Sequence, residues 1–253
     1  MSRPVLEVES VTKVFGGVTA VRSVDMKVLP QSITAVIGPN GAGKTSLFNV
    51  ITGFEAPNEG SVRFQEEDVT GLEPWQVAQR GLIRSFQTPT GFPALSVWEN
   101  LMVGGSQYRH EGLWAGLLGS WRTAEKATAE RARQLLKDLD LWELRNMLLA
   151  DLPPGDIKLV DFARQWMAKP KMLLLDEPAS GVDPGSIERL SSLIRRIRDQ
   201  GITVLVVDHN IGFVLGIADE IHVMSLGQII ATGTPEQVVN DPTVIEIYLG
   251  RGA

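Results

Sequence analysis

Short runs of apolar residues alternate with turn residues over the first part of the chain, and this pattern predicts strands. Pro74 to Arg80 then shows a helical pattern, and Leu82 to Phe86 returns to strand. The expected early strands are Val5–Val8, Val18–Val21, Ser23–Val28, Ile33–Val36 and Ser61–Phe64, with breaks at Gly16-Gly17 and Pro30. The first part of the chain is therefore expected to form sheet structure.

Residues 88–169 change to a helical pattern. Ser96 and Glu99 have the spacing of a capping box, and Ala124 to Leu139 places apolar residues on one side of a helix. Between these helices, Leu113 to Trp121 is unusually apolar. It is either core of a helical subdomain, which we favour, or an exposed surface for a partner.

Strands and helices alternate again after Lys171. The expected elements are a strand Met172–Leu175, a helix from Asp183-Pro184 to Gly201, a strand Ile202–Val207, a helix Ile211–Ala218, a strand Glu220–Met224, and two short helices opening at Thr234 and Asp241. This order predicts a layered α/β core. A β-rich N-terminal part precedes it, and the helical stretch is inserted in it. One domain over 1–253 would contain a core of 1–87 and 170–253 and a helical part of 88–169.

Composition narrows the class of protein. The net charge of −6 argues against a dedicated nucleic-acid binder, so no nucleic-acid partner is expected. The absence of cysteine excludes disulfides, thiolate zinc sites and a cysteine nucleophile. No apolar run approaches the roughly 20 residues that span a bilayer, and the N-terminus lacks the apolar block of a signal peptide. We expect a soluble chain that is not exported.

The stretch between the strand at Ile33 and the next helix matches the phosphate-binding loop pattern of Gly, four residues and Gly-Lys-Thr. Its glycines permit positive φ and let backbone N–H groups approach an anion, helped by the helix N-terminus. Lys44 would reach the terminal phosphates and Thr45 would hold Mg²⁺. The expected ATP-binding residues are Gly38, Pro39, Asn40, Gly41, Ala42, Gly43, Lys44, Thr45 and Ser46.

A second acidic site follows the apolar strand Met172–Leu175. Asp176, at the end of that strand, is in the place where phosphate-loop enzymes hold Mg²⁺ through water. Glu177 projects differently and is suited to orient or deprotonate an attacking water. Together with the phosphate loop, this pair predicts nucleotide hydrolysis.

These motifs occur in the order of the ATP-binding cassette (ABC) ATPases, which the whole chain resembles. The stretches concerned are the phosphate loop, Phe86-Gln87, Asp176-Glu177, Ser180-Gly181-Val182-Asp183-Pro184 and Val207-Asp208-His209. Within that superfamily the chain is most similar to the ATP-binding subunits of branched-chain amino acid importers. The supporting stretches are Lys13–Val21, Ser96–Asn100, Ala231–Pro235 and Val244–Gly250.

The resemblance implies a P-loop NTPase (RecA-like) layered core with an N-terminal antiparallel β subdomain and an inserted α-helical subdomain. It also implies further residue roles. Phe15 would stack on adenine, Ser46 would touch the α-phosphate, and Gln87 would contact Mg²⁺ or the attacking water. His209 would contact the γ-phosphate and keep Glu177 aligned. The catalytic residues that the resemblance implies are Glu177, His209, Gln87 and Lys44. The residues implied to hold Mg²⁺ are Thr45, Gln87 and Asp176. The loop implied to contact the second subunit contains Ser180, Gly181 and Asp183.

One motif departs from the family. Its Leu-Ser-Gly-Gly-Gln segment, which acts on the nucleotide of the opposite subunit, corresponds here to Leu152-Pro153-Pro154-Gly155-Asp156. Pro153 lacks the hydroxyl donor, Pro154 lacks a backbone N–H, and Asp156 brings a negative charge towards a polyphosphate. In a simpler interpretation, Asp156 caps the helix and the prolines stiffen its entry.

The resemblance implies an ATPase subunit of an amino-acid importer, peripheral to the cytoplasmic face of the inner membrane. ATP and Mg²⁺ would bind, and the partners would be permease subunits, a second ATP-binding subunit and, through the permease, an external solute-binding protein. A non-transport ABC ATPase and a subunit with impaired hydrolysis remain alternatives. The residues do not decide between import and export, or between a homodimer and a heterodimer.

Overall fold

A computed structural model describes the backbone of residues 3–85, 91–105 and 120–249. It divides into two compact units. The core unit comprises Met1–Gln87, Lys171–Ser180 and Ile194–Ala253, and the helical unit comprises Thr88–Pro170 and Gly181–Leu193. Residues 181–193, which sequence analysis assigns to the core, therefore belong to the helical unit.

The core unit begins with an antiparallel sheet, as predicted. Its strands β1 (Leu6–Phe15), β2 (Val18–Val28), β4 (Glu59–Phe64) and β5 (Glu67–Asp68) lie in the order β2-β1-β4-β5. Gly16 (φ 53°) and Gly17 (φ 88°) form the tight turn of the first hairpin. The prediction of separate strands on either side of Arg22 is wrong. The strand continues through Ser23, which takes a φ of 43° where the register with β1 shifts.

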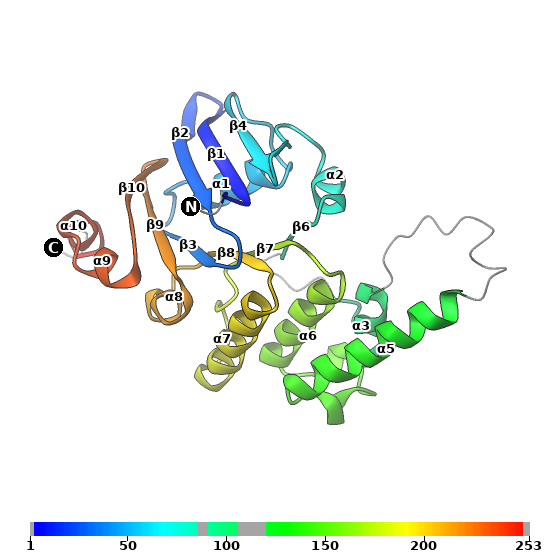
Figure 1. Cartoon of the computed structure of the whole chain (residues 1–253). Coiled ribbons are helices and arrows are strands. Elements are labelled where there is room, and N and C mark those ends of the chain that lie inside the picture. The colour runs from blue at the N-terminus through cyan, green and yellow to red at the C-terminus, as the bar shows by residue number, and fades with distance from the viewer. Residues whose placement is uncertain (1–2, 86–90, 106–119, 250–253) are drawn as a thin grey trace. The chain divides into compact units, whose positions relative to one another are not determined.

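A second sheet carries the parallel strands (Figure 1). It contains β3 (Ile33–Ile37), β6 (Leu82–Arg84), β7 (Met172–Asp176), β8 (Thr203–Val207), β9 (Glu220–Ser225) and β10 (Gln228–Gly233), in the order β10-β9-β3-β8-β7-β6. Only β10 is antiparallel to its neighbour within this described sheet. Every residue of β3, β7 and β8 is buried, so these strands read as continuous apolar runs. Sequence analysis misses β10, a half-exposed edge strand without clear alternation.

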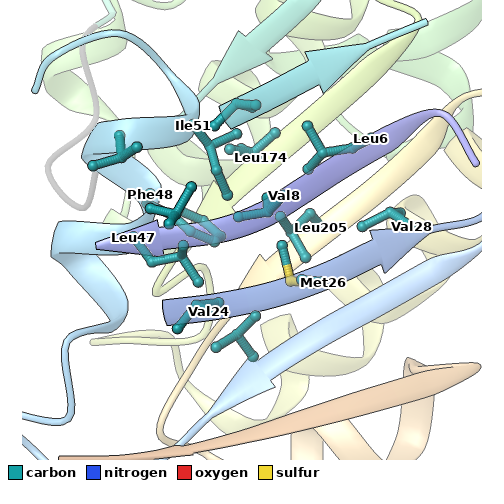
Figure 2. Packing of buried hydrophobic residues seen from close by; sticks show 14 of the residues in the cluster. Leu6, Val8, Val24, Met26, Val28, Leu47, Phe48, Ile51, Leu174 and Leu205 are labelled. Atoms are coloured by element: carbon teal, nitrogen blue, oxygen red, sulfur yellow. The ribbon is translucent and has the colours of Figure 1, made fainter. Parts of the chain in front are cut away.

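Apolar side chains from both sheets and from the first helix form the main core of this unit (Figure 2). Leu47, Phe48 and Ile51 of α1 (Lys44–Ile51) pack against residues of β1 and β2 on one side and of β7 and β8 on the other. The other helices of the unit are α2 (Pro74–Gln79), α8 (Ile211–Ile217), α9 (Pro235–Val239) and α10 (Pro242–Leu249). This packing fixes α1, and with it the loop that opens it.

The helical unit contains α3 (Val97–Gly105), α5 (Ser120–Asp138), the short 3₁₀ helices η1 (Trp142–Leu144) and η2 (Leu149–Asp151), and α6 (Pro154–Met167). The helix α7 (Pro184–Asp199) starts in this unit and ends in the core unit. The predicted capping box is confirmed, because the Ser96 N–H donates to Glu99 (2.8 Å) and the Glu99 N–H donates to Ser96 Oγ (3.2 Å). Most of the apolar stretch Leu113–Trp121 lies outside the described residues.

A buried histidine gives the core unit a pH-dependent stability. His222 on β9 is 4% exposed, and its Nδ1 lies 2.8 Å from Thr232 Oγ1 on β10. Burial lowers the pKa of His222 from 6.5 to about 4. Between these two pH values, His222 binds a proton in the unfolded chain but not in the folded chain. The stability that is present above pH 6.5 is therefore lost as the pH falls towards 4.

We expect His222 to account for about 3 kcal/mol of this loss. Denaturant unfolding of wild type and His222→Gln between pH 7 and pH 4 measures it. The difference in unfolding free energy between the two proteins should shrink or reverse as the pH falls. Parallel curves would contradict a role for His222.

Candidate nucleotide-binding and catalytic site

The carboxyl ends of three neighbouring strands bring the predicted site residues to one edge of the second sheet. β8 lies between β3 and β7, with Val207 opposite Val36 on one side and Asp176 on the other. The phosphate loop follows β3, Asp176-Glu177 ends β7, and Asp208-His209 follows β8. Open α/β sheets bind ligands at such carboxyl ends.

The loop between β3 and α1 has no room for side chains at two of its glycines. A Cβ on Gly38 (φ 155°) would lie 2.1 Å from the Met224 carbonyl oxygen. A Cβ on Gly43 (φ 100°) would lie 2.2 Å from the Ala20 carbonyl oxygen. The backbone is therefore held in a conformation that only glycine adopts easily, and α1 begins immediately after it at Lys44.

Lys44 is held within this loop. Its side chain is largely buried, and Nζ donates to the carbonyl oxygens of Gly38 (2.7 Å) and Pro39 (3.0 Å). Burial lowers the pKa of Lys44, while the nearby carboxylates of Glu177, Asp176 and Asp208 act in the opposite direction. Thr45 beside it is exposed, so its hydroxyl is accessible to a ligand.

Asp176 and Glu177 differ sharply in their surroundings. Asp176 is 8% exposed; its N–H donates to Ser85 Oγ (3.1 Å) and its Oδ2 accepts from Arg84 (2.7 Å). Glu177 takes a φ of 47°, unusual for a residue with a side chain, while its N–H donates to the Val207 carbonyl (2.7 Å). The side chain of Glu177 is 25% exposed, against 10% for that of Asp176, so Glu177 is the more accessible of the two carboxylates.

His209 lies beside Glu177, with Nδ1 3.8 Å from Glu177 Oε2, and its side chain is 56% exposed. The preceding residue has a role that sequence reasoning missed. Asp208 is fully buried and accepts from the backbone N–H groups of Ala179 and Asn210, both at 2.8 Å. It thereby ties the segment after Glu177 to the end of β8. The position of this Asp directly after a buried strand is the sequence feature from which its structural role could have been predicted.

Phe15 ends β1 and its side chain is 40% exposed. The Lys13 ammonium lies 4.9 Å from the centre of the Phe15 ring and forms an ion pair with Glu55 (2.9 Å). An anchored cation thus covers part of the ring, which remains accessible to a flat partner. Gln87 lies outside the described residues.

The segment Leu152–Asp156 forms the entry to α6 in the helical unit. Pro153 is the N-cap residue without a side-chain hydrogen bond, and Pro154 is the first helical residue. The interpretation that Asp156 caps the helix is wrong, because Asp156 sits in the first turn and forms an ion pair with Arg189 of α7. Its negative charge is therefore balanced within the unit.

Close packing of two helix starts explains why Gly155 is retained in this segment. A Cβ at Gly155 would lie 2.8 Å from Ser186 Oγ and 3.2 Å from Asp183 Oδ2. Asp183 accepts from the Ser186 N–H (3.1 Å), which confirms that it caps α7. Hydrogen bonds from the side chain and backbone of Ser186 lower the pKa of Asp183. Two other residues of the predicted dimer-contact loop have defined backbone conformations. Gly181 has a positive φ of 69°. In the core unit, the Ser180 N–H donates to the Glu177 carbonyl (3.1 Å).

A glycine-cradled lysine at the start of a helix, with two carboxylates on an adjacent strand end, is typical of a P-loop NTPase. Comparisons with known protein families identify its class. The ABC transporter family matches residues 21–180, and a branched-chain amino acid ATP-binding cassette transporter model matches residues 228–253. The chain belongs to the ABC transporter family and is an ATPase of its ATP-binding cassette type.

Proteins related to this chain in sequence match it over its whole length. The high-affinity branched-chain amino acid transport ATP-binding protein LivG of Escherichia coli K12 is 40% identical, over 99% of this chain and 100% of LivG. BraF of Pseudomonas aeruginosa, described in the same words, is 38% identical over the same shares. A crystal structure of an ABC transporter cassette in its ADP conformation has a TM-score of 0.85 at 36% identity, covering 98% of this chain and 100% of that one. Across the described part of the chain, no helix is long and apolar enough to cross a membrane.

Proposed function

We propose that this chain is the ATP-hydrolysing subunit of an importer for branched-chain or related amino acids. The observation that carries the proposal is the meeting of Lys44, Asp176 and Glu177 at the ends of β3 and β7, on either side of β8. The full-length similarity to LivG and BraF supports the class of cargo.

The described residues fit ATP with Mg²⁺. The glycines keep side chains out of the phosphate loop, and the N-terminus of α1 favours an anion. Lys44 exchanges its contacts with the Gly38 and Pro39 carbonyls for phosphate oxygens, and the accessible ring of Phe15 stacks on adenine. The residues from Gly38 to Ser46 surround the phosphates, with Ser46 at the α-phosphate.

Thr45, Asp176 and Gln87 would hold Mg²⁺, because hydroxyl, carboxylate and amide oxygens are the ligands it prefers. No cluster of three or more acidic or histidine side chains suited to a metal occurs among the described residues. Phosphate oxygens and water would complete the coordination of Mg²⁺. When bound, Mg²⁺ neutralises phosphate charge and orients the γ-phosphate for attack.

Glu177 is the proposed general base for the attacking water. His209 orients the Glu177 carboxylate and contacts the γ-phosphate, and Gln87 contacts the same water. The 3.8 Å separation of His209 and Glu177 exceeds a hydrogen bond, and bound nucleotide is expected to shorten it.

The chain is proposed to work at the cytoplasmic face of the membrane, bound to permease subunits that receive solute from an external binding protein. A second ATP-binding subunit would complete the nucleotide site of this chain through its own signature segment. It would also meet the loop that contains Ser180, Gly181 and Asp183. No nucleic acid is expected as a partner.

The Pro153-Pro154 segment supports a heterodimer. Because both prolines lack the donors that the family uses, this chain would serve poorly at the phosphate loop of its partner. Its own loop, completed by an intact partner segment, would still hydrolyse ATP.

Uptake of labelled amino acids tests the cargo. The chain is reconstituted in proteoliposomes with its co-purified permease, partner ATPase and external binding protein. We expect leucine, isoleucine or valine to enter with ATP inside the vesicles, and lysine to stay out. ATP-dependent uptake of other solutes only would contradict the proposed cargo.

A further inference from the structure

A buried arginine lies directly behind the acidic residue proposed to hold Mg²⁺. Arg84 ends β6, which runs parallel to β7 with Arg84 opposite Leu174. Its side chain is 8% exposed, and that of Asp176 is 10% exposed. A guanidinium is rarely buried to this degree unless it is paired with an opposite charge.

The two ends of the guanidinium bind different elements of the core unit. Nη2 donates to Asp176 Oδ2 at 2.7 Å. Nη1 donates to Asn49 Oδ1 (2.7 Å) and Thr52 Oγ1 (3.3 Å). Asn49 and Thr52 are three residues apart, on one face at the end of α1. Arg84 therefore joins the end of β7 to the helix that carries Lys44 and Thr45.

Aromatic rings restrict the arginine further. Its guanidinium carbon lies 5.9 Å from the centre of the Phe48 ring and 5.6 Å from that of Phe54. Phe48 belongs to the packed core shown in Figure 2. Hydrogen bonds at both ends and rings beside the guanidinium hold it in one place.

We infer that Arg84 is a positioning residue for the Mg²⁺ site. It occupies Oδ2 of Asp176 and so fixes the rotamer in which Oδ1, which has no hydrogen bond to a described residue, is presented to a water bound to Mg²⁺. Through Asn49 and Thr52 it also sets the position of Asp176 relative to α1. Mg²⁺ demands near-ideal octahedral geometry, so a carboxylate free to rotate would serve it less well. This inference rests on the proposed role of Asp176.

Two effects of removing Arg84 have opposite signs. Without the arginine, Asp176 gains uncompensated negative charge, which by itself would attract Mg²⁺ more strongly. It also loses the hydrogen bond that fixes the orientation of its carboxylate. We expect the loss of orientation to outweigh the gain in attraction, because Mg²⁺ demands near-ideal octahedral geometry.

Fluorescent ATP binding by the purified full-length chain tests this. Affinity is measured in EDTA and then as a function of Mg²⁺. In Arg84→Met, the Mg²⁺ concentration for half-maximal effect should rise about tenfold or more, as for other residues that orient metal ligands. Affinity in EDTA should stay within about twofold, because the hydrogen bonds of Arg84 reach Asp176 and α1 and not the phosphate loop itself. A purely structural arginine would instead weaken binding equally with and without Mg²⁺.

Arg80→Met is the matched control, because Arg80 follows α2 and forms a more exposed ion pair with Glu67 (3.0 Å). It should leave the Mg²⁺ dependence unchanged. Arg84→Lys is the second variant, should Arg84→Met fail to fold. It keeps the charge without the planar fork, and the expected rise is smaller but in the same direction. An unchanged or lower Mg²⁺ requirement in either folded Arg84 variant would overturn the inference. Absence of any Mg²⁺ effect on wild type would instead refute the proposed function.

Discussion

Glu177→Gln should slow ATP turnover by about a hundredfold or more, while ATP binding is preserved. The substitution removes the base but keeps the size of the side chain. The unusual φ of 47° at Glu177 is retained for either residue, because the Glu177 N–H and the adjoining Asp208 contacts hold the backbone. Steady-state phosphate release and equilibrium nucleotide binding, measured on the same preparation, separate the two effects.

Glu236→Gln is the control for this substitution. Glu236 lies in the first turn of α9, in the same unit but on another element, and its loss of charge should leave turnover unchanged. Near-normal hydrolysis in Glu177→Gln would exclude Glu177 as the base. Loss of binding together with turnover would show that the residue holds the nucleotide instead.

Pro153→Ser should raise the ATPase rate of this chain when it is assayed alone. In a homodimer both sites would depend on the Pro153-Pro154 segment, and the lone chain should hydrolyse ATP slowly. Serine restores a hydroxyl donor at the N-cap of α6, where the proline provides no side-chain hydrogen bond. A hydrogen bond to a charged group is worth roughly 1.5–3 kcal/mol, or about one to two decades in rate.

Pro153→Ala separates this effect from the relief of a stiff helix entry. Alanine, like serine, has a backbone N–H in place of the proline ring, but it has no hydroxyl donor, so the alanine variant should remain slow. Adding the partner ATPase should raise the turnover of wild type without any substitution. Vigorous turnover by the lone wild-type chain, with no gain in Pro153→Ser, would contradict the heterodimer.

Local patterns were sufficient to predict much of the fold. The order of apolar strand, glycine-rich loop and helix around Lys44 is encoded within about fifteen residues, and each part depends on its neighbours in sequence. The Ser96 capping box and the Asp183 cap are likewise local, and both are found in the structure. Arg22 shows the limit: the pattern predicts a break there, but β2 continues through Arg22 and Ser23 because a bulge in β2 maintains its pairing with β1.

Contacts between distant segments could not be predicted in this way. Arg84 and Asp176 are 92 residues apart, and their pairing depends on the parallel register of β6 and β7. Asp156 looked like a cap or an uncompensated charge, because nothing in its own segment indicates the ion pair with Arg189 of α7. In both cases the chemistry of an acidic residue is set by an arginine that sequence spacing does not identify.

Calorimetric titration of the purified chain with ATP and Mg²⁺ tests the central claim most directly, because every proposed role depends on a nucleotide held by the loop around Lys44. We predict saturable binding to wild type that is retained in Glu177→Gln and strongly weakened in Lys44→Ala, which loses the cation now held by the Gly38 and Pro39 carbonyls. No binding to folded wild type, or binding that Lys44→Ala leaves unchanged, would contradict the account.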